Sequence, residues 1–134
     1  MILLDTHVLI WFVQADPVLG AQAREQIETC EEELGVSAIT PWEVAMLVSK
    51  KRVSLGRPAG DWVNRTLALD TIRLIPLEPA IAIAAGELEG LHGDPADRII
   101  IATARHFSAP LLTADRAILA YGAAGHVETI DAGR

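Results

Sequence analysis

Four acidic residues stand out because each falls at the start of a predicted helix that follows, or packs beside, an apolar strand. They are Asp5, Glu43, Asp97 and Asp115. Carboxylates gathered in one cleft raise one another's pKa, so they need a compensating positive charge. All-oxygen ligand sets select hard divalent cations such as Mg²⁺ or Mn²⁺ rather than zinc. Such ions lower the pKa of a bound water and clamp phosphoryl oxygens, which indicates phosphoryl-transfer chemistry.

The elements that must position these acids alternate between extended and helical patterns, as in an α/β fold with a largely parallel sheet. Apolar runs predict strands over 2–5, 36–39, 72–75, 110–113 and 127–130. Further patterns predict helices over 8–14, 17–32, 41–51, 61–69, 79–91, 96–107 and 115–121. In a parallel sheet the carboxyl ends of the strands open on one edge, where ligands bind. We therefore expect the four acids to converge at that edge.

Each acid also has a structural explanation that competes with a metal site. Asp5 and Asp115 are well suited to N-cap a helix. The segment Thr40-Pro41-Trp42-Glu43 is typical of a capping box, with its first residue as the cap and its last residue reaching back. Asp94 is predicted to cap the helix that carries Asp97. Capping explains each acid singly, whereas the shared edge explains their joint placement and favours a metal site.

Composition limits the class of protein. The chain has 134 residues, 51% hydrophobic and 22% charged, which predicts one folded domain over residues 1–134. A single cysteine, no basic segment before the first apolar run and no apolar run of ~20 residues favour a cytoplasmic protein without a membrane partner. The net charge of −7 by itself argues against nucleic acid. Divalent ions bound among the acids would reverse the sign of the charge in that cleft.

The four acids lie inside longer motifs. The first two are Leu3-Leu4-Asp5-Thr6-His7-Val8-Leu9-Ile10-Trp11 and Ser37-Ala38-Ile39-Thr40-Pro41-Trp42-Glu43. The third runs from His92 to Ala104 around Asp97, and the fourth is Leu111-Leu112-Thr113-Ala114-Asp115. In this order they resemble the motifs of PIN-domain proteins, and specifically the VapC toxins of bacterial toxin–antitoxin pairs. One such motif is weak evidence, but four in order across the chain are specific.

The resemblance implies a three-layer α/β/α domain with a central, mainly parallel sheet. It implies an Mg²⁺- or Mn²⁺-dependent endoribonuclease, the toxin of a type II pair, in which a metal-activated water attacks an RNA phosphodiester. Asp5, Glu43 and Asp97 would be metal ligands, and Asp115 would bind directly or through water. Such a toxin is commonly a homodimer inhibited by a cognate antitoxin. The motifs encode neither the RNA that is cut nor the number of ions.

Two other classes of function remain open. A non-catalytic PIN-fold binding module would keep the fold without turnover, although the intact acids count against it. A receiver-like signalling domain would carry an acidic pair after the first strand and a lysine after a late strand. Here Asp5 is followed by Thr6 and His7, and Asp115 is followed by Arg116. The nuclease is therefore the preferred prediction.

Several residues near the motifs have further predicted roles. Arg98 and Arg116 each follow a site acid, so they are either phosphate contacts or partners of neighbouring carboxylates. Thr113 is expected beside the acids as a polar support. Trp62, on the 61–69 helix, is expected to anchor an antitoxin in an apolar groove beside the preceding helix.

Overall fold

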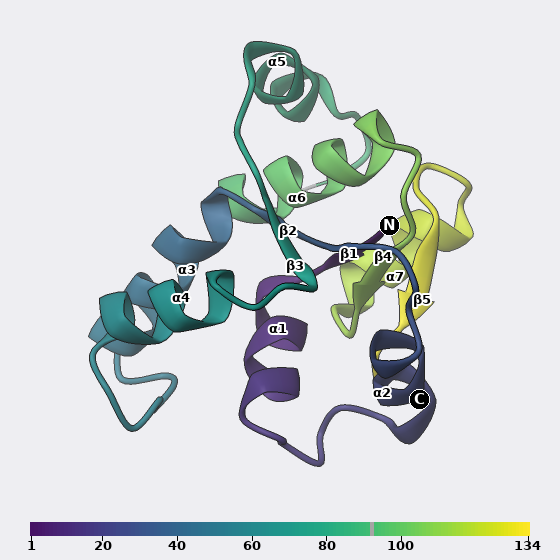
Figure 1. Ribbon diagram of the computed structural model, residues 1–134. Coiled ribbons are helices and arrows are strands. Elements are labelled where there is room, and N and C mark those ends of the chain that lie inside the picture. The colour runs from purple at the N-terminus through teal and green to yellow at the C-terminus, as the bar shows by residue number, and fades with distance from the viewer. Residues whose placement is uncertain (92) are drawn as a thin grey trace.

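Five parallel strands form the centre of the computed structural model, which describes residues 1–91 and 93–134 (Figure 1). The strands are β1 (Ile2–Leu4), β2 (Leu34–Ser37), β3 (Ile72–Ile75), β4 (Leu111–Thr113) and β5 (Thr129–Asp131). Their order in the sheet is β3-β2-β1-β4-β5, and every pairing is parallel. Because β1 is central, the residue that follows it lies in the middle of the sheet's carboxyl edge.

Seven helices in the described residues connect the strands. They are α1 (Thr6–Val13), α2 (Ala21–Glu28), α3 (Ile39–Ser49), α4 (Ala59–Leu67), α5 (Pro79–Glu87), α6 (Pro95–His106) and α7 (Arg116–Ala123). Helices α1–α4 cover one face of the sheet and α6 and α7 cover the other, with α5 packed on α6 (Figure 1). The predicted three-layer α/β/α fold is therefore confirmed. Among the described helices, none combines the length and the apolar character that crossing a membrane requires.

The two cores follow from the alternation of side chains along the strands. Leu4 of β1 and Leu112 of β4 join the core beneath α1–α4. Their neighbours Leu3 and Leu111 join the core beneath α6 and α7. Successive side chains of a strand point to opposite faces, so an apolar run without alternation supplies both cores. These strands end at the edge of the sheet where the acidic residues follow.

Helix α2 is much shorter than the predicted helix over 17–32. The Asp16 carboxylate accepts the Val18 N–H at 2.9 Å, which turns the chain before the helix starts. Gly20 then occupies the N-cap position, and the helix ends at Glu28. Turn chemistry around Asp16 therefore overrides the helical pattern of the residues that follow.

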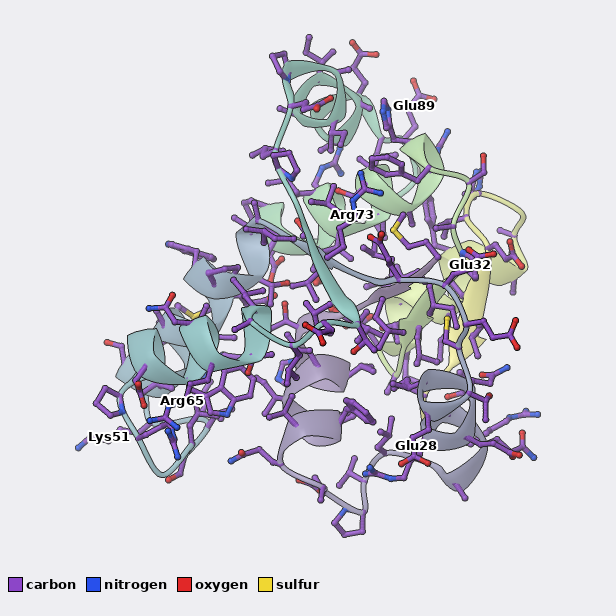
Figure 2. The ribbon with its side chains drawn as sticks, in the orientation of Figure 1. Glu28, Glu32, Lys51, Arg65, Arg73 and Glu89 are labelled. Carbon is purple, nitrogen blue, oxygen red and sulfur yellow. The ribbon has the colours of Figure 1, made fainter. Side chains whose placement is uncertain are left out.

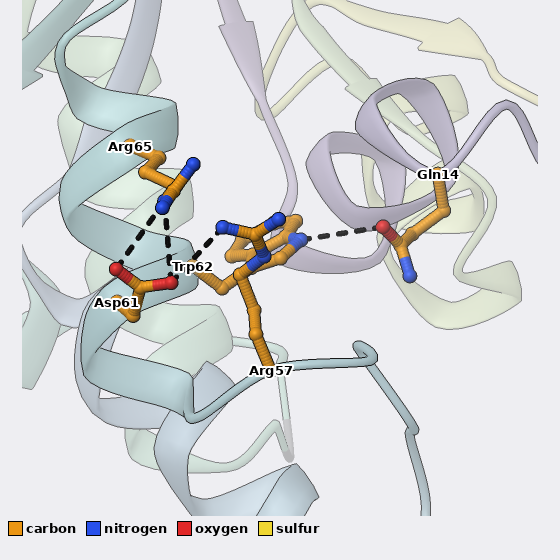
Figure 3. Close-up of polar contacts among 5 residues, drawn as sticks. All are labelled: Gln14, Arg57, Asp61, Trp62 and Arg65. Carbon is orange, nitrogen blue, oxygen red and sulfur yellow. Dashed lines mark hydrogen bonds and ion pairs between the residues drawn. The ribbon is translucent and has the colours of Figure 1, made fainter.

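Trp62 is buried in the core, although it also lines a pocket of about 310 Å³ together with Gln14, Arg57 and Arg65. Its side chain is 4% exposed and belongs to the same core as Val44 and Leu47 of α3. Its indole Nε1–H donates to Gln14 Oε1 at 3.3 Å (Figure 3). The prediction that Trp62 anchors a partner is therefore wrong, because the chain's own packing fills the space between α3 and α4. On the outer side of α4, Arg65 and Arg57 hold the pKa of Asp61 below its usual range (Figure 3).

Candidate metal centre

Asp5 and Glu43 are the only buried acidic residues in the part of the chain that the structure describes, each 6% exposed. Other charged side chains, such as Glu28, Lys51 and Glu89, are exposed on the outside of the molecule (Figure 2). Burying a carboxylate costs free energy unless hydrogen bonds or a cation compensate it. The groups around Asp5 and Glu43 therefore indicate whether hydrogen bonds or a bound cation compensate the two buried carboxylates.

Asp5 directly follows β1 and caps α1, as predicted. Its Oδ1 accepts the Thr6 N–H at 2.8 Å, and its Oδ2 accepts the Thr113 hydroxyl at 2.6 Å. The Thr113 oxygen in turn accepts the Asp115 N–H at 3.1 Å. Burial raises the pKa of Asp5, while the hydrogen bonds from Thr113 and Thr6 oppose the rise. The ends of β1 and β4 are thus joined through one carboxylate, and Thr113 is the polar support that was expected.

The predicted capping box over 40–43 is wrong. Helix α3 begins at Ile39, because the Ser37 hydroxyl oxygen accepts the Ile39 N–H at 3.2 Å and turns the chain earlier than expected. Thr40 is therefore inside the helix and buried, and its hydroxyl forms a hydrogen bond with the Thr6 hydroxyl at 3.0 Å. Glu43 is left free of any capping role.

Glu43 has an unsatisfied oxygen. Within the described residues, its buried Oε1 has no hydrogen-bond partner. Burial raises the pKa of Glu43, the neighbouring Thr6 hydroxyl partly opposes the rise, and the nearby charges of Asp5 and Asp94 add to it. A buried acceptor without a donor is rare in folded proteins and needs an explanation. A cation bound at this oxygen would supply one.

Asp97 lies one turn into α6. The helix is capped by Asp94, whose Oδ1 accepts the Asp97 N–H at 2.8 Å, as predicted. Burial raises the pKa of Asp97 to about 7, together with repulsion from Asp94, Asp5, Asp115 and Glu43. Oxygens of Glu43, Asp94 and Asp97 lie within 4.8 Å of one another, close enough to share one ion. Asp94 is predicted from the sequence only to cap the helix, although its spacing of three from Asp97 places both residues in one helical turn.

All four predicted acids line a single pocket of about 250 Å³. Its lining residues are Asp5, His7, Trp11, Glu43, Asp94, Asp97, Ala114 and Asp115. Asp115 is exposed and also caps α7, accepting the Ile118 N–H at 3.0 Å. Asp5 and Asp115 line the pocket outside the close group formed by Glu43, Asp94 and Asp97.

The donors of this pocket fit a hard divalent cation. They are carboxylate oxygens, and none of the ion pairs found in residues 1–91 and 93–134 joins a lysine or arginine to these acids. Desolvation raises the pKa values of Asp5 and Glu43 by more than the neighbouring His7 lowers them. Oxygen-rich sites without a basic partner are typical of Mg²⁺, Mn²⁺ and Ca²⁺.

Arg98 has neither of its predicted roles. Its guanidinium donates to four backbone carbonyls, at 2.9, 2.9, 3.2 and 2.8 Å, which belong to Ala85, Leu91, Gly86 and Leu88. Carbonyls at the end of a helix have no partner within that helix. Arg98 thus satisfies the end of α5, which stops at Glu87 rather than at 91, and ties it to α6. Arg116 is exposed beside Asp115, and its phosphate contact stays a prediction.

Replacing Arg98 with Lys is expected to lower the free energy of unfolding by about 2 kcal/mol, because one ammonium group cannot reach four carbonyls. Scanning calorimetry should show a Tm lower by about 6 °C. Amide hydrogen exchange should rise at the end of α5. The matched control is Arg105→Lys, an exposed position on the same helix. Equal losses of stability in the two variants would contradict the role of Arg98 in holding the end of α5.

Comparison with known proteins identifies the family. The model of the PIN domain matches residues 2–124, a span that includes all four predicted acids. Ribonuclease VapC22 of Mycobacterium tuberculosis is 35% identical over 116 residues, which are 86% of this chain and 87% of the relative.

Solved structures share the same fold. VapC20 of Mycobacterium tuberculosis, described as a toxin that cleaves the sarcin-ricin loop, has a TM-score of 0.70 at 16% identity, covering 96% of this chain and 98% of that one. A toxin–antitoxin complex from Klebsiella pneumoniae has a TM-score of 0.66 at 22% identity, covering 97% and 96%. DNA-bound VapBC from Salmonella typhimurium has a TM-score of 0.69 at 18% identity, covering 98% of each chain. Together with the sequence matches, the motifs and the acidic pocket, these likenesses show that the chain belongs to the PIN-domain family, as a VapC-type ribonuclease toxin.

Proposed function

We propose that the chain is a metal-dependent endoribonuclease that holds Mg²⁺ or Mn²⁺ with Asp5, Glu43, Asp97 and Asp115. Asp94 is added as a ligand because of its place in the close group of carboxylates. The observation that carries the proposal is the Glu43 Oε1 atom, which is buried without a hydrogen-bond partner among the described residues. A divalent ion in this pocket would satisfy that oxygen and offset the repulsion between the acids.

Each residue has its own task in this proposal. Thr113 and the Thr6 N–H hold the Asp5 carboxylate in a fixed orientation from two sides. Asp97, whose pKa is about 7, must lose its proton before it can bind a cation, so protons and metal compete there. When bound, a divalent ion lowers the pKa of a bound water and stabilises negative charge on phosphoryl oxygens. The burial of Asp5 and Glu43 excludes solvent from one side of the pocket and strengthens its electrostatics.

The partners follow from the relatives. The Klebsiella pneumoniae structure is a toxin–antitoxin complex, and by analogy this chain is bound by a cognate antitoxin. The proposal also includes a single PIN domain over residues 1–134, a homodimer, and action on RNA in the cytoplasm. The antitoxin must contact a surface other than Trp62, since that side chain is buried.

The experiment maps the ends in total bacterial RNA after incubation with the protein. Wild type should create new ends with Mg²⁺ and none with EDTA. Glu43→Gln should create at least about 100-fold fewer ends, because a neutral amide compensates a cation far less than a carboxylate does. Glu28→Gln on the exposed face of α2 is the matched control, with the same chemical change outside the pocket.

Two results would count against the nuclease. Ends that form equally fast in EDTA, or with Glu43→Gln, would show that the cleavage does not use this site. Tight RNA binding without new ends under any divalent ion would instead favour the non-catalytic binding module.

A further inference from the structure

The pocket that gathers the acids also has an aromatic side. His7 and Trp11 line it together with the carboxylates. Both belong to α1 and are four residues apart, so their side chains lie on the same face of the helix. Their ring centroids are 5.9 Å apart and the rings are tilted by 50°, a normal geometry for an aromatic pair.

The two rings differ in how firmly they are held. Trp11 is half-buried and packs against the core that contains Val8 and Leu9. His7 is exposed, although its neighbours Thr6 and Val8 are fully buried. The pair therefore has a fixed inner ring and an accessible outer ring. This arrangement suits a flat ligand that enters the pocket from solvent.

The chemistry of the substrate adds a reason for such a platform. The net charge of the chain is −7, and the pocket is lined by five carboxylates and no lysine or arginine. Most proteins bind nucleic acid through basic side chains that contact phosphates, and this pocket has none. Stacking of bases on aromatic rings provides affinity that does not depend on basic residues.

We propose that the His7–Trp11 pair stacks the nucleobase adjacent to the scissile phosphate and so positions single-stranded RNA over the acids. This inference rests on the proposed ribonuclease function and assigns a base subsite within the same pocket. A base is joined to the sugar that carries the reacting phosphate, so one small pocket lined by both carboxylates and aromatic rings accommodates both. Unstacked bases of single-stranded RNA are the form that aromatic side chains recognise.

The first test measures RNA binding in an Asp97→Asn background, in which cleavage is blocked. The probes are a short single-stranded RNA that spans a mapped cleavage site and the same RNA with an abasic nucleotide beside the scissile phosphate. His7→Ala should raise the Kd for the intact RNA about 10-fold, whereas His7→Phe should keep it within about 2-fold. For the protein that retains His7, the Kd for the abasic RNA should be about 10-fold higher than the Kd for the intact RNA. His7→Ala should raise the Kd for the abasic RNA no further.

Two further variants separate stacking from other causes. His7→Lys supplies a positive charge without a ring and should bind as weakly as His7→Ala. Trp42→Ala is the matched control, because Trp42 is 57% exposed on α3 and does not line the pocket. It should leave the Kd within about 2-fold of its original value. The fluorescence of Trp11 should be quenched by the intact RNA and not by the abasic RNA, and Trp11→Phe should remove this change.

The outcomes are distinguishable. Tight binding by His7→Lys together with weak binding by His7→Phe would show a phosphate contact and overturn the stacking platform. An equal loss with His7→Ala on intact and abasic RNA would also overturn it. Failure of the ribonuclease proposal would be seen in a different experiment, the mapping of RNA ends, as the absence of Mg²⁺-dependent ends with the wild-type protein. In that case oligoadenylate replaces the mapped RNA as the binding probe.

Discussion

Asp97→Asn is expected to abolish RNA cleavage and at the same time to stabilise the metal-free protein. The loss of a ligand charge should lower kcat/KM on the order of 10³-fold. In EDTA the same change should raise the free energy of unfolding by about 2 kcal/mol, and the Tm by about 6 °C, because the neutral amide carries no charge to be desolvated on burial and no longer repels its neighbours. The gain is smaller than the pKa difference alone would give, since the carboxyl is partly exposed and screened.

The pH dependence of stability gives a second signature of the same residue. The Asp97 carboxyl ionises near 3.8 in the unfolded chain and near 7 in the folded chain. Between these values the folded state holds a proton that the unfolded state has released, so the stability of the metal-free protein falls as pH rises from about 4 to 7. Above about 7 this contribution is constant, because both states are ionised. Asp97→Asn should reduce this slope in calorimetry across the range.

The control for both measurements is Asp70→Asn, which removes the same charge at an exposed position outside the pocket. It should change neither the cleavage rate nor, by more than about 0.5 kcal/mol, the stability. Undiminished cleavage by Asp97→Asn would show that Asp97 is not a ligand of the metal site. Identical slopes of stability against pH for that variant and wild type would show that the Asp97 carboxyl does not have a raised pKa in the folded chain.

Mg²⁺ or Mn²⁺ added to the chelator-treated wild type is expected to raise its Tm. An ion at about 100 times its Kd should stabilise the folded chain by about 2.7 kcal/mol, or roughly 8 °C. The rise should be larger at about pH 8 than at about pH 6, because the metal displaces a proton whose pKa is about 7 at Asp97. Differential scanning fluorimetry over a metal titration at both pH values measures the effect.

Glu43→Gln should lose most of this stabilisation, because it removes the negative charge of the carboxylate that includes the buried Oε1. Sodium chloride at matched ionic strength separates specific binding from general screening of the acids. An equal rise with sodium chloride, or a rise that is unchanged in Glu43→Gln, would place the bound ion elsewhere.

The fold and the convergence of the acids could both be predicted from the sequence. Short apolar runs marked the strands, and parallel strands end on a common edge, so the residues just after them had to meet there. Asp5 and Asp115 illustrate this reasoning, because each follows an apolar strand, caps the next helix and lines the same pocket. Capping and placement in the pocket proved to be compatible at both residues.

The errors arose where a side chain finds its partner far away in the chain. Thr40 matched a local capping pattern, yet its hydroxyl pairs with Thr6. Arg98 stood beside an acid, yet its partners are the carbonyls at the end of another helix. The apolar face of α4 suggested a free groove around Trp62, and nothing local indicated that Gln14 would meet its indole. Sequence spacing defines which face a residue occupies but not what covers that face.

The hydrogen bond between Asp5 and Thr113 spans 108 positions of the chain. The remaining pocket acids come from α3, α6 and the start of α7, so no short stretch of the chain contains more than a fraction of the site. A partly folded intermediate that lacks the pairing of β1 with β4 has no pocket, because its carboxylates are dispersed along a flexible polymer. We therefore expect cleavage at the proposed metal centre only from a chain in which β1 has paired with β4.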